Sequence, residues 1–217
     1  MDLQLTDVSL RSIAVSEMSN NVYLLTSATT GQQVIIDAAD DVEAIESLVD
    51  AGAEAGPADA AHVTDVLTTH RHWDHVRALK PITERYDART VAGVNDAEAI
   101  TEESGQTIDQ EVAHGETLSF DGFELEVIEL RGHTPGSVAY VLRDSGGEVV
   151  IFSGDSLFPG GPGKTWSSED FGSLMDDLEE RIFGQFGDEA HVLPGHGDAT
   201  TIGAERPQIP EWRERGW

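Results

Sequence analysis

The 217-residue chain contains no cysteine, so neither a disulfide bond nor a thiolate ligand is available to it. Any bound metal must therefore be held by imidazole and carboxylate groups, a ligand set that suits zinc, iron or manganese. Long apolar runs are also missing, and the opening residues, MDLQLTDVSLRSIAV, lack the basic and apolar regions of a signal peptide. These absences predict a soluble cytoplasmic protein that does not work at a membrane.

Basic residues are scarce as well. The chain has 13 lysine and arginine residues against 41 acidic ones, for a formal charge of −28, and only Lys80 and Lys164 are lysines. The acidic residues are spread along the chain, which is typical of a hydrated acidic surface and resembles halophilic proteins from a high-salt cytoplasm. Such a surface repels phosphate backbones and argues against nucleic-acid binding. It also predicts a fold that loosens at low ionic strength, where repulsion between carboxylates is poorly screened.

Apolar periodicity predicts hairpins that alternate with helices. The expected strands are 2–7, 11–16, 22–26, 33–36, 63–68, 90–94, a hairpin around 120–123, 138–142, 149–152 and 190–193. The expected helices are 42–49, 74–80 ending near Pro81, 96–101 and 171–182. Residues 51–60 are expected to connect elements, and 102–114 show no clear pattern. This order predicts one domain over 1–217, with two mostly antiparallel sheets and helices outside them.

One short stretch, Thr69–His75, concentrates three of the eight histidines and a carboxylate in the sequence THRHWDH. His70 and His72 lie two residues apart at the end of an expected strand, so both imidazoles point to the same side and can reach one ion. Asp74 and His75 follow as the chain turns into a helix, where they can face a second ion. The spacing therefore predicts a metal site.

Three further candidate ligands each close an expected strand and enter a glycine-rich turn: His133, Asp155 and His196. Glycine allows the backbone to bend sharply close to a metal. Together with the four side chains of 69–75 they make seven nitrogen and oxygen ligands, enough for two zinc-like ions and one bridging carboxylate. A single histidine is more often an ordinary packing or surface residue, and that interpretation is kept for His62, His114 and His191.

The sequence resembles the metallo-β-lactamase superfamily through four motifs in chain order: THRHWDH (69–75), GHTPGS (132–137), SGDSLF (153–158) and PGHG (194–197). NNVYLL (20–25) and IIDAAD (35–40) are similar to the first hairpin of that fold and to its strand that ends in a structural aspartate. The resemblance covers roughly 20–203. It implies an α/β fold, a four-layer αβ/βα sandwich of two mixed β-sheets with outer helices and metals in a cleft between the sheets.

The resemblance also implies a role for each candidate ligand. The first metal would be held by His70, His72 and His133. The second would be held by Asp74, His75 and His196. Asp155 would bridge the two, Asp74 would also orient the attacking hydroxide, and Asp37 would hydrogen-bond the loop 69–75. His72 stands where diiron flavoprotein relatives place a glutamate, which favours two zinc ions and hydrolysis, with iron or manganese as further options.

Within the superfamily, GHTPGS and GDSLF are most similar to the hydroxyacylglutathione hydrolase (glyoxalase II) group. That group implies hydrolysis of a small thioester by a metal-bridging hydroxide. It uses a lysine and, two residues later, an aromatic side chain to hold the thiol carrier, and Lys164 and Trp166 stand at those positions. The chain ends in IGAERPQIPEWRERGW where that group has a helical extension, so another thiol, ester or amide fits as well.

Two alternatives stay open. A persulfide dioxygenase-like enzyme would use one iron on His70, His133 and Asp155, and metal analysis with oxygen uptake separates it from a two-zinc hydrolase. A β-lactamase-like amide hydrolase would need a penicillin-shaped cleft, which a chromogenic cephalosporin tests. The oligomeric state is not indicated by the sequence.

Overall fold

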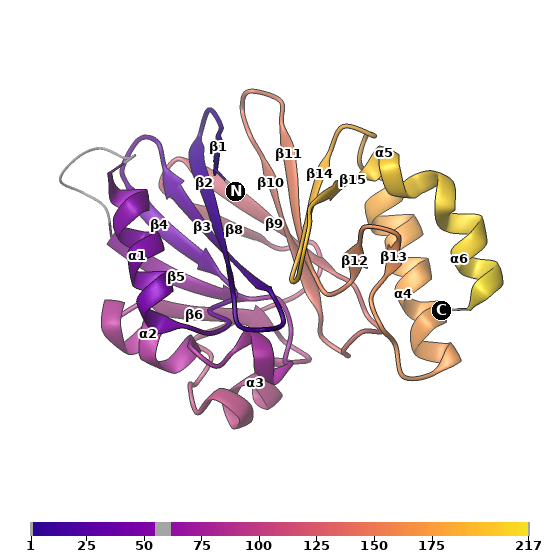
Figure 1. Ribbon diagram of the computed structural model, residues 1–217, viewed down its shortest axis with the longest axis horizontal. Coiled ribbons are helices and arrows are strands. Elements are labelled where there is room, and N and C mark those ends of the chain that lie inside the picture. The colour runs from indigo at the N-terminus through magenta and orange to yellow at the C-terminus, as the bar shows by residue number, and fades with distance from the viewer. Residues whose placement is uncertain (1, 55–61, 217) are drawn as a thin grey trace.

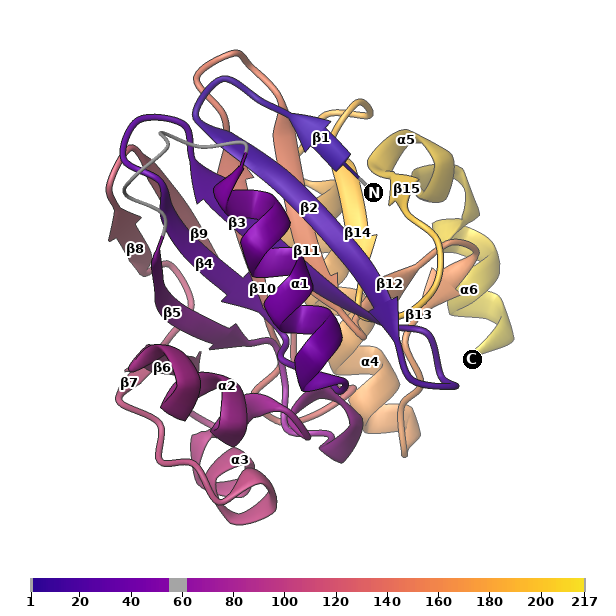
Figure 2. The ribbon, with the colours of Figure 1, turned by 60° about the vertical axis from the view of Figure 1, so that its left-hand side comes forward.

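Two β-sheets stack face to face, and helices cover their outer sides (Figures 1 and 2). The computed structural model describes residues 2–54 and 62–216. The element order and the two mixed sheets confirm the predicted four-layer αβ/βα sandwich.

The first sheet has seven strands in the order β1-β2-β3-β4-β5-β6-β7. These strands are β1 (Asp2–Gln4), β2 (Val8–Val15), β3 (Asn20–Ser27), β4 (Gln32–Ile36), β5 (His62–Thr68), β6 (Arg89–Gly93) and β7 (Gln110–Val112). The first four pair antiparallel, but β4 to β7 pair parallel. The prediction of a mostly antiparallel sheet is wrong here, because crossover helices return the chain to the same end of the sheet. Those helices are α1 (Val42–Ala53), α2 (Leu79–Tyr86) and α3 (Ala97–Ser104).

The second sheet has six strands in the order β15-β14-β11-β10-β9-β8. These strands are β8 (Thr117–Phe120), β9 (Phe123–Glu129), β10 (Val138–Arg143), β11 (Val149–Gly154), β14 (His191–Pro194) and β15 (Thr200–Thr201). The two expected hairpins, β8–β9 and β10–β11, are present and antiparallel. β11 and β14 pair parallel, and α4 (Ser168–Asp177) with the π-helical segment η2 (Leu178–Phe183) connects them.

Three apolar clusters hold the layers together. Leu25 and Phe152 belong to the central cluster between the sheets. Ile45 of α1 belongs to the cluster that packs helices on the first sheet, and Leu174 of α4 to the one on the second sheet. The loops that follow β5, β9, β11 and β14 carry the candidate ligands, and these strands are anchored in the three clusters.

Several expected boundaries differ from the structure. The chain makes only a 3₁₀ turn at η1 (Trp73–His75), and α2 then begins at Leu79 and passes through Pro81. Proline is tolerated there because an N–H in the first turn of a helix has no intrahelical acceptor. α1 extends into the expected connector 51–60, of which 55–60 lie outside the described residues.

The C-terminal segment folds onto the outer side of the second sheet as α5 (Ile202–Glu205), η3 (Arg206–Gln208) and α6 (Ile209–Arg215) (Figure 1). Trp212 is fully buried there. The buried Glu205 carboxylate accepts hydrogen bonds from Gly160 N at 2.8 Å and Thr200 Oγ1 at 2.6 Å. Gly160 joins the two short strands β12 (Leu157–Phe158) and β13 (Gly161–Pro162), so this segment braces the loop that follows Asp155.

A search of the described residues finds no helix that combines the length and the apolar character needed to span a membrane.

Candidate metal centre

Three histidines from two loops turn ring nitrogens toward one point. His72 Nδ1 lies 3.1 Å from His70 Nε2 and 2.9 Å from His133 Nε2. Zinc–nitrogen bonds of about 2.0–2.1 Å in a tetrahedral site separate neighbouring ligand atoms by roughly 3.3 Å. The spacing of these three nitrogens is therefore close to that of ligands around one ion.

A second group forms beside the first. His75 Nε2 lies 3.0 Å from His196 Nε2, and His196 Nε2 lies 3.2 Å from Asp74 Oδ2. Asp74 and His75 come from the 3₁₀ turn after β5, whereas His196 follows β14 more than 120 residues later in the chain. The fold thus brings together two groups of three potential metal ligands, the same groups that the sequence motifs single out.

Asp155 lies between the two groups. Its Oδ1 is 3.5 Å from His75 Nε2, and its Oδ2 is 3.6 Å from His133 Nε2 and 3.4 Å from His196 Nε2. Oδ1 is buried without a hydrogen-bond partner among the described residues. A buried carboxylate oxygen without a partner is costly unless a cation or a proton faces it, so its position fits a bridging ligand.

The outer ring nitrogens of the histidines are held by hydrogen bonds that fix their tautomers. His133 Nδ1 donates to the carbonyl oxygen of Lys164 at 2.7 Å, and His196 Nδ1 donates to that of Met18 at 3.0 Å. A carbonyl only accepts, so each Nδ1 carries a proton and each Nε2 is the atom left to bind a cation at the centre. Such partners around the ligands are a regular feature of protein metal sites.

Asp37 holds the loop 69–75 through hydrogen bonds to Thr69 and His75. Its carboxylate accepts from Thr69 N and Thr69 Oγ1, both at 2.7 Å, and from His75 Nδ1 at 3.0 Å. Because Thr69 Oγ1 gives its proton to Asp37, it accepts from His70 Nδ1 at 3.0 Å. Asp37 therefore sets the tautomers of His70 and His75, and its own lone pairs are used in doing so, which favours an orienting role over a ligand role.

Burial lowers the pKa of two histidines of the centre, whereas neighbouring carboxylates raise the pKa of a third. Burial holds the pKa of His70 well below its usual value and lowers the pKa of His72 to about 4. Burial alone would lower the pKa of His196, but hydrogen bonds to Asp155 and Asp74 raise it to about 10. Burial alone would raise the pKa of Asp155, but the hydrogen bond with His196 lowers it. Positive charge is thus favoured next to ionised carboxylates, the place where a divalent cation would displace the protons.

The residue that follows β14, Gly195, has no room for a side chain. A Cβ at Gly195 would lie 2.3 Å from Asp155 Oδ1 and 2.6 Å from His75 Cε1. The backbone therefore forms one wall of the centre and presses directly against two candidate ligands.

Two contributors were not singled out by the sequence. Asn20 Nδ2 donates to Asp74 Oδ2 at 2.9 Å, and its motif NNVYLL gave the available signal. The fully buried Asp96 accepts from Arg71 N at 3.0 Å, Thr134 Oγ1 at 2.5 Å and Gly136 N at 2.9 Å. Asp96 precedes α3 without capping it, so its carboxylate instead ties the loop of His70 and His72 to the loop of His133.

Lys164 and Trp166 both lie beside His133. The Lys164 carbonyl accepts from the His133 ring, and Lys164 Nζ lies 4.3 Å from the centre of the Trp166 ring. The side chain of Trp166 is 65% exposed, and Met18 and Trp73 are also exposed near the ligands. Met18 and Trp73 line one hollow with Arg77, and Trp166 lines a different one with Arg71 and His133.

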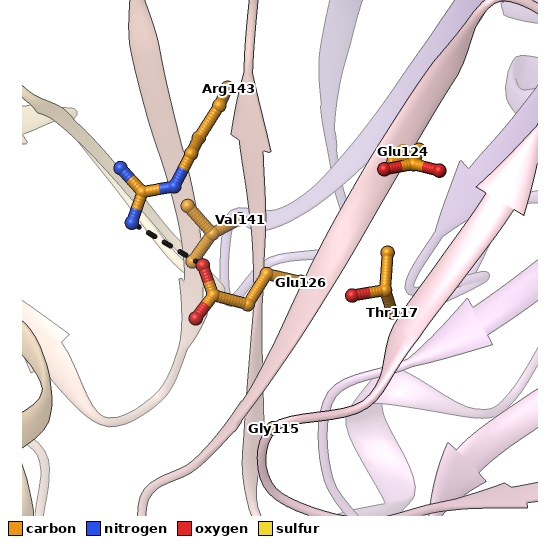
Figure 3. Close-up of a pocket in the computed structure, with 6 residues that line it drawn as sticks. All are labelled: Gly115, Thr117, Glu124, Glu126, Val141 and Arg143. Atoms are coloured by element: carbon orange, nitrogen blue, oxygen red, sulfur yellow. Dashed lines mark hydrogen bonds and ion pairs between the residues drawn. The ribbon is translucent and has the colours of Figure 1, made fainter.

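Another hollow lies away from the centre, on the outer face of β8, β9 and β10 (Figure 3). Arg143 and Glu126 form an ion pair there at 3.4 Å. This face is polar because alternate residues of β8 and β9 point to solvent. Its lining contains none of the candidate ligands.

Comparison with known proteins agrees with this geometry. The model of the metallo-beta-lactamase superfamily matches residues 15–196. The hydroxyacylglutathione hydrolase GloC of Haemophilus influenzae is 30% identical over 161 residues, 67% of this chain and 74% of that protein. A hydroxyacylglutathione hydrolase of a Synechococcus strain is 33% identical over 176 residues, 81% of this chain but only 60% of that protein. ETHE1 from Myxococcus xanthus superimposes with a TM-score of 0.76 at 30% identity, over 93% of this chain and 83% of that one.

The chain belongs to the metallo-beta-lactamase superfamily. Its fold and its histidine and aspartate clusters are those of a metallo-hydrolase of this superfamily, which binds divalent metals.

Proposed function

We propose that this protein is a binuclear zinc-dependent hydrolase of a small thioester of the hydroxyacyl-thiol type, with residues 1–217 as one catalytic domain. The position of Asp155 is the observation that carries the proposal, because its two oxygens face both groups of candidate ligands. A single-ion site has no use for a carboxylate shared in this way. The names of the two hydroxyacylglutathione hydrolases support the choice of a thioester.

Each side chain has a task in this proposal. One ion would be held by His70, His72 and His133. The other would be held by Asp74, His75 and His196, with Asp155 shared between them. When bound, the two ions supply Lewis acidity and an activated water for attack on a thioester carbonyl.

The remaining residues orient and bind. Asp74, which Asn20 Nδ2 holds at 2.9 Å, is the proposed catalytic residue because its carboxylate would accept a hydrogen bond from the attacking water and fix its direction. Asp37 would keep the histidine loop in place from behind. Lys164 and Trp166 would contact the thiol part of the substrate, beside His133.

A second candidate is a mononuclear-iron, persulfide dioxygenase-like enzyme, which the likeness to ETHE1 leaves open. It would use His70, His133 and Asp155 and leave His75 and His196 without a ligand role. Against it stands the close approach of these two imidazoles, whose Nε2 atoms are 3.0 Å apart. A β-lactamase-like amide hydrolase is a third option that a chromogenic cephalosporin excludes or supports.

We expect the purified protein, reconstituted with zinc, iron or manganese at high salt, to hydrolyse hydroxyacyl thioesters. Two ions per chain and release of free thiol without oxygen uptake would support the proposal, because both groups of ligands would then be filled. Three measurements are made on the same sample. A thiol reagent measures thiol release, an oxygen electrode measures oxygen uptake, and elemental analysis gives the ions per chain. One iron per chain with oxygen consumption would instead identify the second candidate.

A further inference from the structure

A cavity of about 310 Å³ opens beside His133. It is bounded by Arg71, by the loop 131–135 that carries His133, by the start of α4 and by the chain after β13. Its lining residues are Arg71, Arg131, Gly132, His133, Thr134, Pro135, Trp166, Asp170 and Ser173. We refer to it as the Arg71 cavity. Two arginines and one carboxylate, Asp170, belong to this lining, whereas another cavity with two arginines, Arg143 and Arg181, also contains two glutamates.

Arg71 is poorly neutralised by its surroundings. Among the described residues, its ion-pair partner is Asp96, with Arg71 Nε at 3.9 Å from Asp96 Oδ1. The Asp96 carboxylate already accepts three shorter hydrogen bonds, from Arg71 N, Thr134 Oγ1 and Gly136 N. The Arg71 side chain is 41% exposed, and its guanidinium keeps most of its five donors for another group.

Other arginines of this acidic protein are placed differently. Arg77, Arg85 and Arg213, for example, each contact a carboxylate at 2.6–2.9 Å. Arg131 makes a two-point contact with Asp177 through Nε at 2.8 Å and Nη2 at 2.6 Å. Asp177 thereby fixes and neutralises Arg131, so Arg71 is the arginine of this lining that lacks a close carboxylate partner among the described residues.

Lys164 adds to the positive charge at this place. It has no carboxylate within ion-pair distance among the described residues, and its Nζ lies over the ring of Trp166, which lines the Arg71 cavity. Two weakly neutralised cations are thus concentrated next to one candidate ligand. The one carboxylate of the lining, Asp170, accepts a hydrogen bond from Ser167 Oγ at 2.7 Å at the start of α4. The protein as a whole carries a charge of −28 and repels anions, so an anionic group would dock where cations such as Arg71 and Lys164 outnumber carboxylates.

We propose that the Arg71 cavity binds an anionic group of the substrate, a carboxylate or a phosphate, and that Arg71 determines this specificity. The inference rests on the proposed thioester hydrolysis and adds the charge of the substrate to it. The planar guanidinium suits such groups because it can donate two parallel hydrogen bonds.

The test compares acetyl thioesters of three thiols at constant ionic strength: 3-mercaptopropionate, phosphopantetheine and the uncharged N-acetylcysteamine. Arg71→Gln is expected to reduce the preference for an anionic over the uncharged thioester about tenfold, through KM and not through kcat. The two anionic thioesters separate a carboxylate from a phosphate. Arg71→Lys should restore part of the preference, and Arg85→Gln, which removes an exposed arginine of α2, should leave it as it is.

A binding measurement separates this inference from the proposed function. S-methyl-3-mercaptopropionate and S-methyl-phosphopantetheine cannot be hydrolysed, and calorimetry with the metal-loaded protein measures their affinity directly. The inference is supported if the protein binds at least one of these compounds and Arg71→Gln lowers that affinity about tenfold, even if no thioester is hydrolysed. The inference is overturned if the protein hydrolyses thioesters but Arg71→Gln changes neither the preference for anionic thioesters nor this affinity. The proposed function would then still stand.

Discussion

Replacing Asp155 with asparagine is expected to lower kcat/KM for thioester hydrolysis by roughly 10³-fold or more and to reduce the bound metal below two ions per chain. The two Asp155 oxygens are the groups that face both His75 and His133. Asparagine keeps the shape of the side chain but replaces one oxygen with a nitrogen donor that cannot bind a cation, and it removes the negative charge. Elemental analysis after dialysis and a thiol-release assay on the same sample measure both effects.

Asp188→Asn provides the matched control, because it makes the same chemical change at a carboxylate that is 70% exposed on the surface. That variant should keep its metal and its turnover. Full turnover of Asp155→Asn with two bound ions would show that Asp155 does not bridge, and the two-ion proposal would have to be abandoned.

Local spacing explains why so much of the centre can be predicted from the sequence. His70, His72, Asp74 and His75 lie within six residues, and a strand followed by a turn allows their side chains few directions. The glycine-rich turns around His133, Asp155 and His196 carry a comparable signal, because a side chain on Gly195 would collide with the candidate ligands Asp155 and His75. The strands and hairpins of the second sheet were predicted for a similar reason, since alternating apolar residues and Asp121-Gly122 are short-range signals.

Contacts between distant residues could not be predicted in this way. Asp96 is 25 residues from Arg71 and 38 from Thr134 in sequence, and an aspartate before a helix is ordinarily explained as a cap. The parallel half of the first sheet was missed because strand direction depends on where each crossover helix packs. A proline after a short apolar pattern predicts a helix end, whereas Pro81 lies in the first turn of α2, which proline tolerates.

Asp96→Ala is expected to weaken metal binding by 10–100-fold, to lower kcat/KM about 100-fold and to destabilise the fold by about 3–5 kcal/mol. The buried carboxylate accepts from Arg71 N, Thr134 Oγ1 and Gly136 N, and alanine leaves all three donors without a partner. The loop with His70 and His72 would then no longer be fixed relative to the loop with His133. A chelator competition well below the melting temperature measures affinity, and urea unfolding measures stability.

A loss of stability alone would not show that Asp96 positions the ligands, so a second buried aspartate is needed for comparison. Asp65→Ala removes a carboxylate that is 2% exposed and bonded to Thr64 Oγ1 and Arg89 Nε, both at 2.6 Å, on the strand that precedes the ligand loop. It should destabilise the fold while metal affinity stays within about twofold of the unaltered protein, because neither partner touches a ligand loop. Equal metal affinity in the two variants would mean that Asp96 serves stability only. A selective loss in Asp96→Ala, partly recovered in Asp96→Asn, which keeps one acceptor oxygen, would identify a residue that holds the two ligand loops in register.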